Sequence, residues 1–121
     1  MTPQAAKAVK RAPDRRQRRY PRYRAEFPVT LTLLSSEGHR SLAAHCRDLA
    51  VAGIGVLVAD ELKVGEVVAL AFALPGSDQP WLLRAVLRHR RGYHYGFEFL
   101  SVSQLQSQTL NEYLSHLERA D

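Results

Sequence analysis

Short apolar stretches with a period near two follow one another between Val29 and Ser101, and turn-forming residues separate them. In such a stretch alternate side chains point to opposite faces, which is typical of strands that bury one face. Six such strands with short connections favour a closed or nearly closed antiparallel barrel, because closure removes exposed strand edges. The predicted fold class is therefore all-β, with a six-stranded antiparallel β-barrel.

The bounds of the predicted strands follow from this alternation and from the residues that interrupt it. The strands span residues 29–35, about 40–47, 53–59, 66–74, 81 to about 90, and 93–101. The fourth is apolar on both faces, so we expect both faces to be covered. The fifth places His89 on the same face as Trp81. The sixth has one aromatic face, made of Tyr93, Tyr95, Phe97 and Phe99. We expect this face to lie in the core or against the helix.

The period changes to that of a helix near the C-terminus. One apolar stripe has the spacing i, i+3, i+4 and i+7 and consists of Leu110, Tyr113, Leu114 and Leu117. Ser103, followed three residues later by Gln106, fits a capping box. The sequence therefore predicts a barrel over residues 28–101 and a helix over residues 103–119 that packs on it.

Positive charge is concentrated at the N-terminus. Residues 1–27 carry nine of the 17 Lys and Arg and two of the 12 Asp and Glu, a net charge of +7, whereas residues 28–121 carry −2. Residues 1–14 have almost no large apolar side chain and are predicted to form a disordered basic tail. Residues 15–27 mix charges with aromatic residues and contain Pro21, which predicts an extended, flexible arm. The nearly neutral body disfavours nucleic acid as a partner.

Several classes of protein and site lack their sequence signals. No apolar run approaches the roughly 18 residues that span a membrane, and the N-terminus lacks the apolar core of a secretory signal. We therefore expect a cytoplasmic protein without membrane insertion. Cys46 is the single cysteine, and the histidines lack metal-ligand spacing, so no metal site is predicted. No catalytic constellation or phosphate cradle is present, so we expect no enzyme activity and no cofactor.

Two arginines precede the first strand, and an Asp-to-Gly segment joins the second and third. In an extended chain Arg18 and Arg22 would lie about 13 Å apart on one side, and closer if Pro21 bends the path. Guanidinium groups bind phosphates bidentately and stack on planar bases. Asp48 could accept hydrogen bonds from the N1 and N2 donors of guanine, and Gly53 would allow close backbone approach. This pattern suits a ligand that combines phosphates with purine rings.

The order of these motifs resembles a known family. An R-x-x-x-R motif, a D-x-S-x-x-G motif, a G-x-E-F strand and a final helix together are similar to the PilZ domain, a bacterial receptor for the second messenger cyclic di-GMP. The resemblance covers residues 15–119, with residues 15–27 as the ligand-binding arm and Gly96–Phe99 in the last strand. It implies a split-barrel fold whose arm closes over cyclic di-GMP and thereby signals to a downstream effector protein.

The resemblance also implies a set of ligand-binding residues. Arg18 and Arg22, with Arg19 beside them, would hold phosphate and guanine, and the segment containing Asp48, Ala50 and Gly53 would line the barrel face. His89, seven residues before Gly96, stands where members of the family can place a ring against a guanine.

Ala50 departs from the family pattern, which has serine there. Losing one neutral hydroxyl contact costs about 0.5 to 1.5 kcal/mol, whereas losing a charge-assisted arginine contact costs about 1.5 to 3 kcal/mol. The substitution should therefore weaken binding without abolishing it. Gln17 stands where relatives that hold two stacked ligand molecules often have arginine, so the number of bound molecules stays open.

Two alternative functions fit parts of the same pattern. One is a small β-barrel that binds RNA or single-stranded DNA through its basic arm and an aromatic strand. The other is a degenerate PilZ adaptor that has lost its ligand, for which Ala50 is the only indication. Salt dependence of binding distinguishes the first alternative from cyclic di-GMP binding, because a polyanion-binding arm loses affinity steeply as salt rises.

Overall fold

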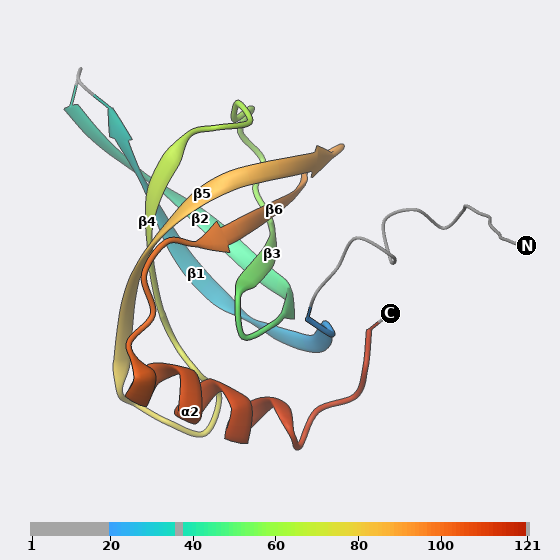
Figure 1. The fold of residues 1–121 in the computed structure, drawn as a ribbon. Helices are drawn as coiled ribbons and strands as arrows, with labels where there is room; N and C mark the ends of the chain where they lie inside the picture. The colour runs from blue at the N-terminus through green and yellow to red at the C-terminus, as the bar shows by residue number, and fades with distance from the viewer. Residues whose placement is uncertain (1–19, 36–37, 121) are drawn as a thin grey trace, which may run out of the picture.

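The computed structural model describes residues 20–35 and 38–120, and these residues form a closed antiparallel barrel with one helix at one end (Figure 1). The elements are β1 (Tyr23–Ser35), β2 (Gly38–Leu49), β3 (Gly53–Leu57), β4 (Val67–Ala73), β5 (Pro80–Arg91), β6 (His94–Phe99) and α2 (Gln104–Leu114). Around the barrel the strand order is β1-β2-β3-β6-β5-β4. The predicted six-stranded barrel with a C-terminal helix is thus confirmed. The tail at residues 1–14 and the arm before residue 20 lie outside the described residues.

The barrel core is built from the inward positions of all six strands. Its largest fully buried side chains include Leu31, Ile54, Leu70, Leu87, Tyr95 and Phe97. The Tyr95 hydroxyl donates to the carbonyl oxygen of Asp60 over 2.9 Å and accepts from the amide of Leu62 over 3.1 Å. This pairing satisfies the one polar atom of a buried aromatic side chain and fixes the segment between β3 and β4.

The capping box at the start of α2 is present as predicted. Ser103 Oγ accepts from the amide of Gln106, and Gln106 Oε1 accepts from the amide of Ser103, each over 3.0 Å. Leu110 and Leu114 of α2 are buried against the barrel. None of the described helices is long and apolar enough to span a membrane.

The helix ends at Leu114, five residues before the predicted end, and the chain after it pairs with the start of β1. The amide of Arg24 donates to the carbonyl oxygen of Glu118, and the amide of Ala120 donates to that of Arg22, each over 2.8 Å. Extended pairing supplies these residues with partners outside the helix, which is why the helical pattern does not continue.

Two further predictions about the barrel are wrong. Strand β1 begins at Tyr23, inside the predicted arm, because Ala25 and Phe27 are buried in the core. Tyr93 does not join the aromatic core face, because it lies in the turn between β5 and β6 and is exposed.

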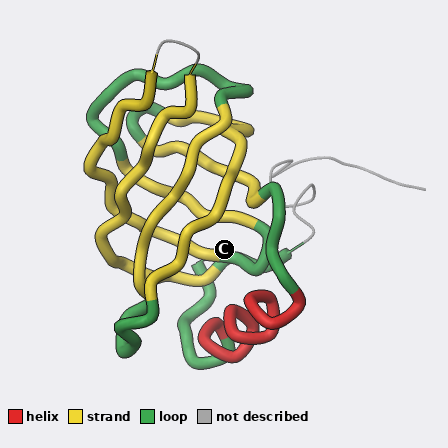
Figure 2. Tube along the Cα trace, turned by 90° about the vertical axis from the view of Figure 1, so that its left-hand side faces the viewer, coloured by secondary structure: helices red, strands yellow, loops and turns green. Residues whose placement is uncertain are grey.

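The expectation that β4 is covered on both faces is also wrong. Its inward residues Val68, Leu70 and Phe72 are buried, but no described element covers the outward ones. Helix α2 lies at one end of the barrel and leaves the outer side of the strands open (Figures 1 and 2). A small barrel with a single short helix cannot cover both its end and its side.

Replacing Leu110 with alanine should lower the free energy of unfolding by about 2 to 5 kcal/mol, because a fully buried side chain would leave a cavity between α2 and the barrel. Leu105→Ala in the same helix is the matched control. Leu105 is 72% exposed, so its loss should change stability by about 0.5 kcal/mol or less. Urea denaturation measures both, and equal effects would contradict the packing described for α2.

Candidate ligand-binding face

A one-residue irregularity in β2 turns Asp48 away from the core. Cys46 is fully buried and pairs with Val56 of β3, whereas Asp48 pairs with Gly55, the next residue back along β3. Arg47 is therefore an extra residue in β2. Simple alternation would place Asp48 on the inward face with Cys46, and the extra residue moves it to the outer face. Such bulges re-aim side chains next to functional sites.

A second irregularity does the same for His89 in β5. Leu87 is buried and pairs with Phe97 of β6, whereas His89 pairs with Gly96. Arg88 is the extra residue here. The predicted placement of His89 on the core face is therefore wrong, because the bulge moves its ring to the outer face of the barrel.

The two irregularities place four residues in one row across the outer face. Asp48 of β2 is paired with Gly55 of β3, Gly55 with Gly96 of β6, and Gly96 with His89 of β5. Gly53 lies two residues before Gly55 and shares its face. We call Gly53, Gly55 and Gly96 the glycine floor, a stretch of outer sheet surface without side chains. Glycines inside strands often mark places where a ligand approaches the backbone closely.

The carboxylate of Asp48 lies over the floor between a cation and an imidazole. Its Oδ1 accepts from Arg22 Nη1 over 2.6 Å, and its Oδ2 lies 3.2 Å from His94 Nε2. The side chains of Arg22 and Asp48 are only 15% and 16% exposed, so solvent screens this charge-assisted pair weakly. A Cβ at position 55 would lie 2.6 Å from the carboxylate, so only glycine lets Asp48 lie in this position.

The ring of His89 lies over the other end of the floor. A Cβ at Gly96 would collide with the imidazole ring, and a Cβ at Gly53 would collide with the carbonyl oxygen of Phe97. The glycines are therefore required by close packing of side chain on backbone. The face therefore presents a carboxylate lying over Gly55 and an imidazole ring lying over Gly96, on neighbouring strands.

The segment between Asp48 and Gly53 forms a tight turn. The amide of Ala50 donates to the carbonyl oxygen of Gly53 over 2.8 Å, and the amide of Gly53 donates back over 3.4 Å. The amide of Phe99 donates to the carbonyl oxygen of Ala52 over 2.9 Å and ties the turn to β6. Ala50 is 5% exposed, so its methyl group adds little surface to the face.

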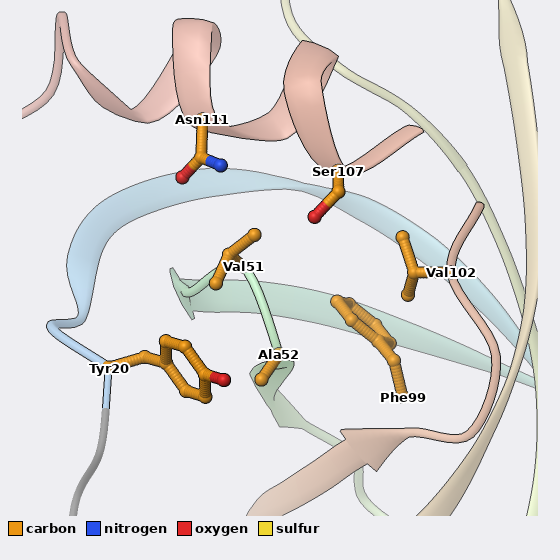
Figure 3. Close-up of a pocket in the computed structure, with 7 residues that line it drawn as sticks. All are labelled: Tyr20, Val51, Ala52, Phe99, Val102, Ser107 and Asn111. Carbon is orange, nitrogen blue, oxygen red and sulfur yellow. The ribbon is translucent and has the colours of Figure 1, made fainter. Parts of the chain in front are cut away.

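A pocket of about 440 Å³ separates this turn from α2 (Figure 3). Its lining consists of Tyr20, Val51, Ala52, Phe99, Val102, Ser107 and Asn111. Tyr20 reaches it from the arm, and Ser107 and Asn111 reach it from α2 (Figure 3). Arg18 and Arg19 lie outside the described residues.

Of the predicted site residues that are described, the structure brings Arg22 to Asp48 and places Gly53 and His89 on the same outer face. Three other residues of the face, Gly55, Gly96 and His94, are not among the predicted ligand-binding residues. Gly53 and Gly55 at a spacing of two share one face of a strand, a signal that indicates the floor. The proximity of His94 to Asp48 has no local signal, because it depends on the pairing of β2, β3 and β6.

Among residues 20–35 and 38–120, no group of three His, Cys, Asp or Glu side chains could hold a metal ion.

A closed six-stranded barrel with a polar, glycine-floored outer face defines a small β-barrel domain. The model of the PilZ domain family matches residues 16–116, and this chain therefore belongs to the PilZ domain family. No curated protein matches the chain in sequence.

Several solved structures have the same fold. The PilZ domain of YcgR from Escherichia coli with cyclic di-GMP is 20% identical, with a TM-score of 0.62 over 84% of this chain and 91% of that one. The motility inhibitor MotI/DgrA of Bacillus subtilis is 22% identical, with a TM-score of 0.65 over 82% of this chain and 49% of that one. The PilZ domain of CeSA from a cellulose-synthesizing bacterium is 18% identical, with a TM-score of 0.59 over 78% and 94%.

Cys46 is buried in β2, two residues before Asp48, and its thiol is a chemical probe of this part of the strand. Burial, with a smaller contribution from the Asp48 carboxylate, raises the pKa of its thiol far above the ordinary value. Above the ordinary thiol pKa the unfolded chain ionises at Cys46, whereas the folded protein keeps this thiol protonated. The free energy of unfolding therefore falls as pH rises above that ordinary pKa. At pH 8.5 we expect iodoacetamide to alkylate the folded protein at least about 100-fold more slowly than the urea-unfolded chain. Similar rates, measured by mass spectrometry, would contradict the burial of this strand.

Proposed function

We propose that this protein is a receptor for cyclic di-GMP that signals to a downstream protein and has no catalytic activity. The observation that carries the proposal is the glycine floor, with Asp48 and Arg22 at one end and His89 at the other. Membership of the PilZ domain family supports the ligand, and so does the solved PilZ domain of YcgR, whose structure is described with cyclic di-GMP.

Each part of the face has a chemical counterpart in the ligand. Arg22 would donate to a phosphate while still neighbouring Asp48, because a guanidinium has five donors. The Asp48 carboxylate would accept from the N1 and N2 donors of a guanine, and His94 would help to hold its orientation. A second guanine would stack on the His89 ring, which the floor holds on the outer face.

The arm would order as the ligand binds. Residues from Tyr23 onward already belong to β1, so we restrict the proposed ordering to the segment before them, with Arg18 and Arg19 closing over the ligand. Tyr20 lines the pocket beside the turn between Asp48 and Gly53, and this position supports such a path for the arm. Ordering would change the surface that a partner protein meets, which is a disorder-to-order switch.

Titration calorimetry with cyclic di-GMP should show submicromolar to micromolar binding to the wild-type chain. Arg22→Ala should weaken binding at least about tenfold, as expected when a charge-assisted contact of about 1.5 to 3 kcal/mol is lost. Arg40→Ala is the matched control, because the Arg40 side chain is 61% exposed, lies at the far end of β2 from Asp48 and should leave affinity unchanged. The absence of heat with folded wild-type protein would refute the receptor function. Steep loss of affinity as salt rises, together with no selectivity for cyclic di-GMP over GMP, would favour the alternative that the protein binds RNA or single-stranded DNA.

A methyl group on the floor should also disrupt the site. Gly96→Ala would push the His89 ring from its position, and His89→Ala would remove the ring, so both should lower affinity for cyclic di-GMP. His116→Ala in the exposed segment after α2 is the control. If both variants stay folded by circular dichroism and bind like the wild type, the ligand does not use this end of the face.

Limited trypsin digestion tests the proposed ordering of the arm. Cleavage after the arginines between residues 15 and 22 should slow when cyclic di-GMP saturates the wild-type protein. In Arg18→Ala the same ligand concentration should protect less, because one of the closing contacts is gone. Unchanged cleavage of a saturated wild-type protein would show that the arm does not order.

A further inference from the structure

The outward side of β4 is an apolar surface that the described fold leaves uncovered. Four residues point outward along this strand, Val67, Ala69, Ala71 and Ala73, and they are half-buried or exposed. Leu82 of β5 pairs with Ala71 and is 70% exposed. We call these five residues the β4–β5 apolar face. The alternate residues Ala69, Ala71 and Ala73 are neighbours on this face and make it flat, and Leu82 projects from its edge.

A groove adjoins this face where β5 meets the start of α2. It has a volume of about 540 Å³ and is lined by Leu82, Leu83, Arg84, Leu100, Ser101 and Gln106. Leu100 is 49% exposed, and the nearby Leu105 of α2 is also exposed, so apolar surface continues across the groove. An apolar area of this kind on an otherwise polar protein marks a site of interaction.

Arg84 is the charged group of this surface. It pairs with Ala69 across the sheet, and its guanidinium makes no hydrogen bond or ion pair with any residue in the described ranges 20–35 and 38–120. Arg88 in the same strand, by contrast, pairs with Glu98 over 2.7 Å. A guanidinium beside apolar side chains favours a partner that brings a carboxylate.

The closed barrel limits the form of that partner. Residues 68–71 of β4 are paired with β1 on one side and with β5 on the other, so an incoming strand finds no free edge in the middle of this face. A helix satisfies its own backbone and can lay an apolar stripe on a flat face with a bordering groove. A second copy of this chain fits less well, because the face has no acidic residue to meet Arg84.

We propose that the β4–β5 apolar face and its groove bind an amphipathic helix of the effector protein, with an Asp or Glu of that helix paired to Arg84. The identification of the helix with the effector rests on the proposed receptor function. The surface itself does not, since it lies away from the glycine floor on a different set of strands.

Photo-cross-linking in the organism that encodes the protein tests this inference. The full chain carries a benzoylphenylalanine at position 82 or, as a matched control, at position 64. Val64 is 63% exposed and lies in the loop before β4. Position 82 should cross-link to a helical segment that contains Asp or Glu at the border of its apolar stripe, and position 64 should not.

The segment is then made as a peptide and titrated with the full chain. Leu82→Asp and Arg84→Glu should each weaken binding at least tenfold, and Val64→Asp should leave it within twofold. Changing the acidic residue of the peptide to Lys should restore binding to Arg84→Glu at least fivefold. A cross-link to a second copy or to RNA, no cross-link specific to position 82, or no rescue would each overturn the inference.

Ligand titration keeps the two proposals distinguishable. Leu82→Asp should bind cyclic di-GMP within twofold of the wild type. A chain that binds cyclic di-GMP but no helix at position 82 would refute this inference alone. A chain that binds the helix but not cyclic di-GMP would refute the receptor function and leave the docking surface.

Discussion

The candidate site depends on two extra residues in strand pairing, one beside Asp48 in β2 and one beside His89 in β5. Without them, alternation would turn an acidic and an imidazole side chain into the barrel core, where burying a charge is costly. With them, both side chains lie on the outer face at opposite ends of the glycine floor. The barrel thus keeps an apolar interior while one wall becomes polar.

Closure of the barrel connects the surfaces that the protein can use. Strand β5 contributes His89 near one end and Leu82 with Arg84 near the other, so one strand takes part in the ligand face and in the β4–β5 apolar face. Arg22 immediately precedes β1, and Arg22 and Arg24 are hydrogen-bonded to Ala120 and Glu118. The ligand face and the C-terminal segment are therefore attached to the same barrel, and α2 covers only its end.

Much of the fold could be predicted from local patterns, because alternation, turn residues and the Ser103–Gln106 capping box are encoded within a few residues. The same alternation misplaced His89, since a bulge leaves no local signal. The spacing of Arg22 and Asp48 indicated a shared ligand, but the approach of His94 to Asp48 requires three paired strands. The open side of β4 could not be predicted either, because apolar composition does not show whether a neighbour covers it.

The most direct test of the ligand face is chemical-shift mapping of the seven glycine amides as cyclic di-GMP is added. The proposed binding mode predicts that Gly55 and Gly96 shift strongly and saturate together, while Gly38 at the start of β2 and Gly76 in the turn after β4, both away from the face, stay unchanged. Changes confined to the N-terminal arm, with Gly55 and Gly96 unmoved at saturating ligand, would contradict it.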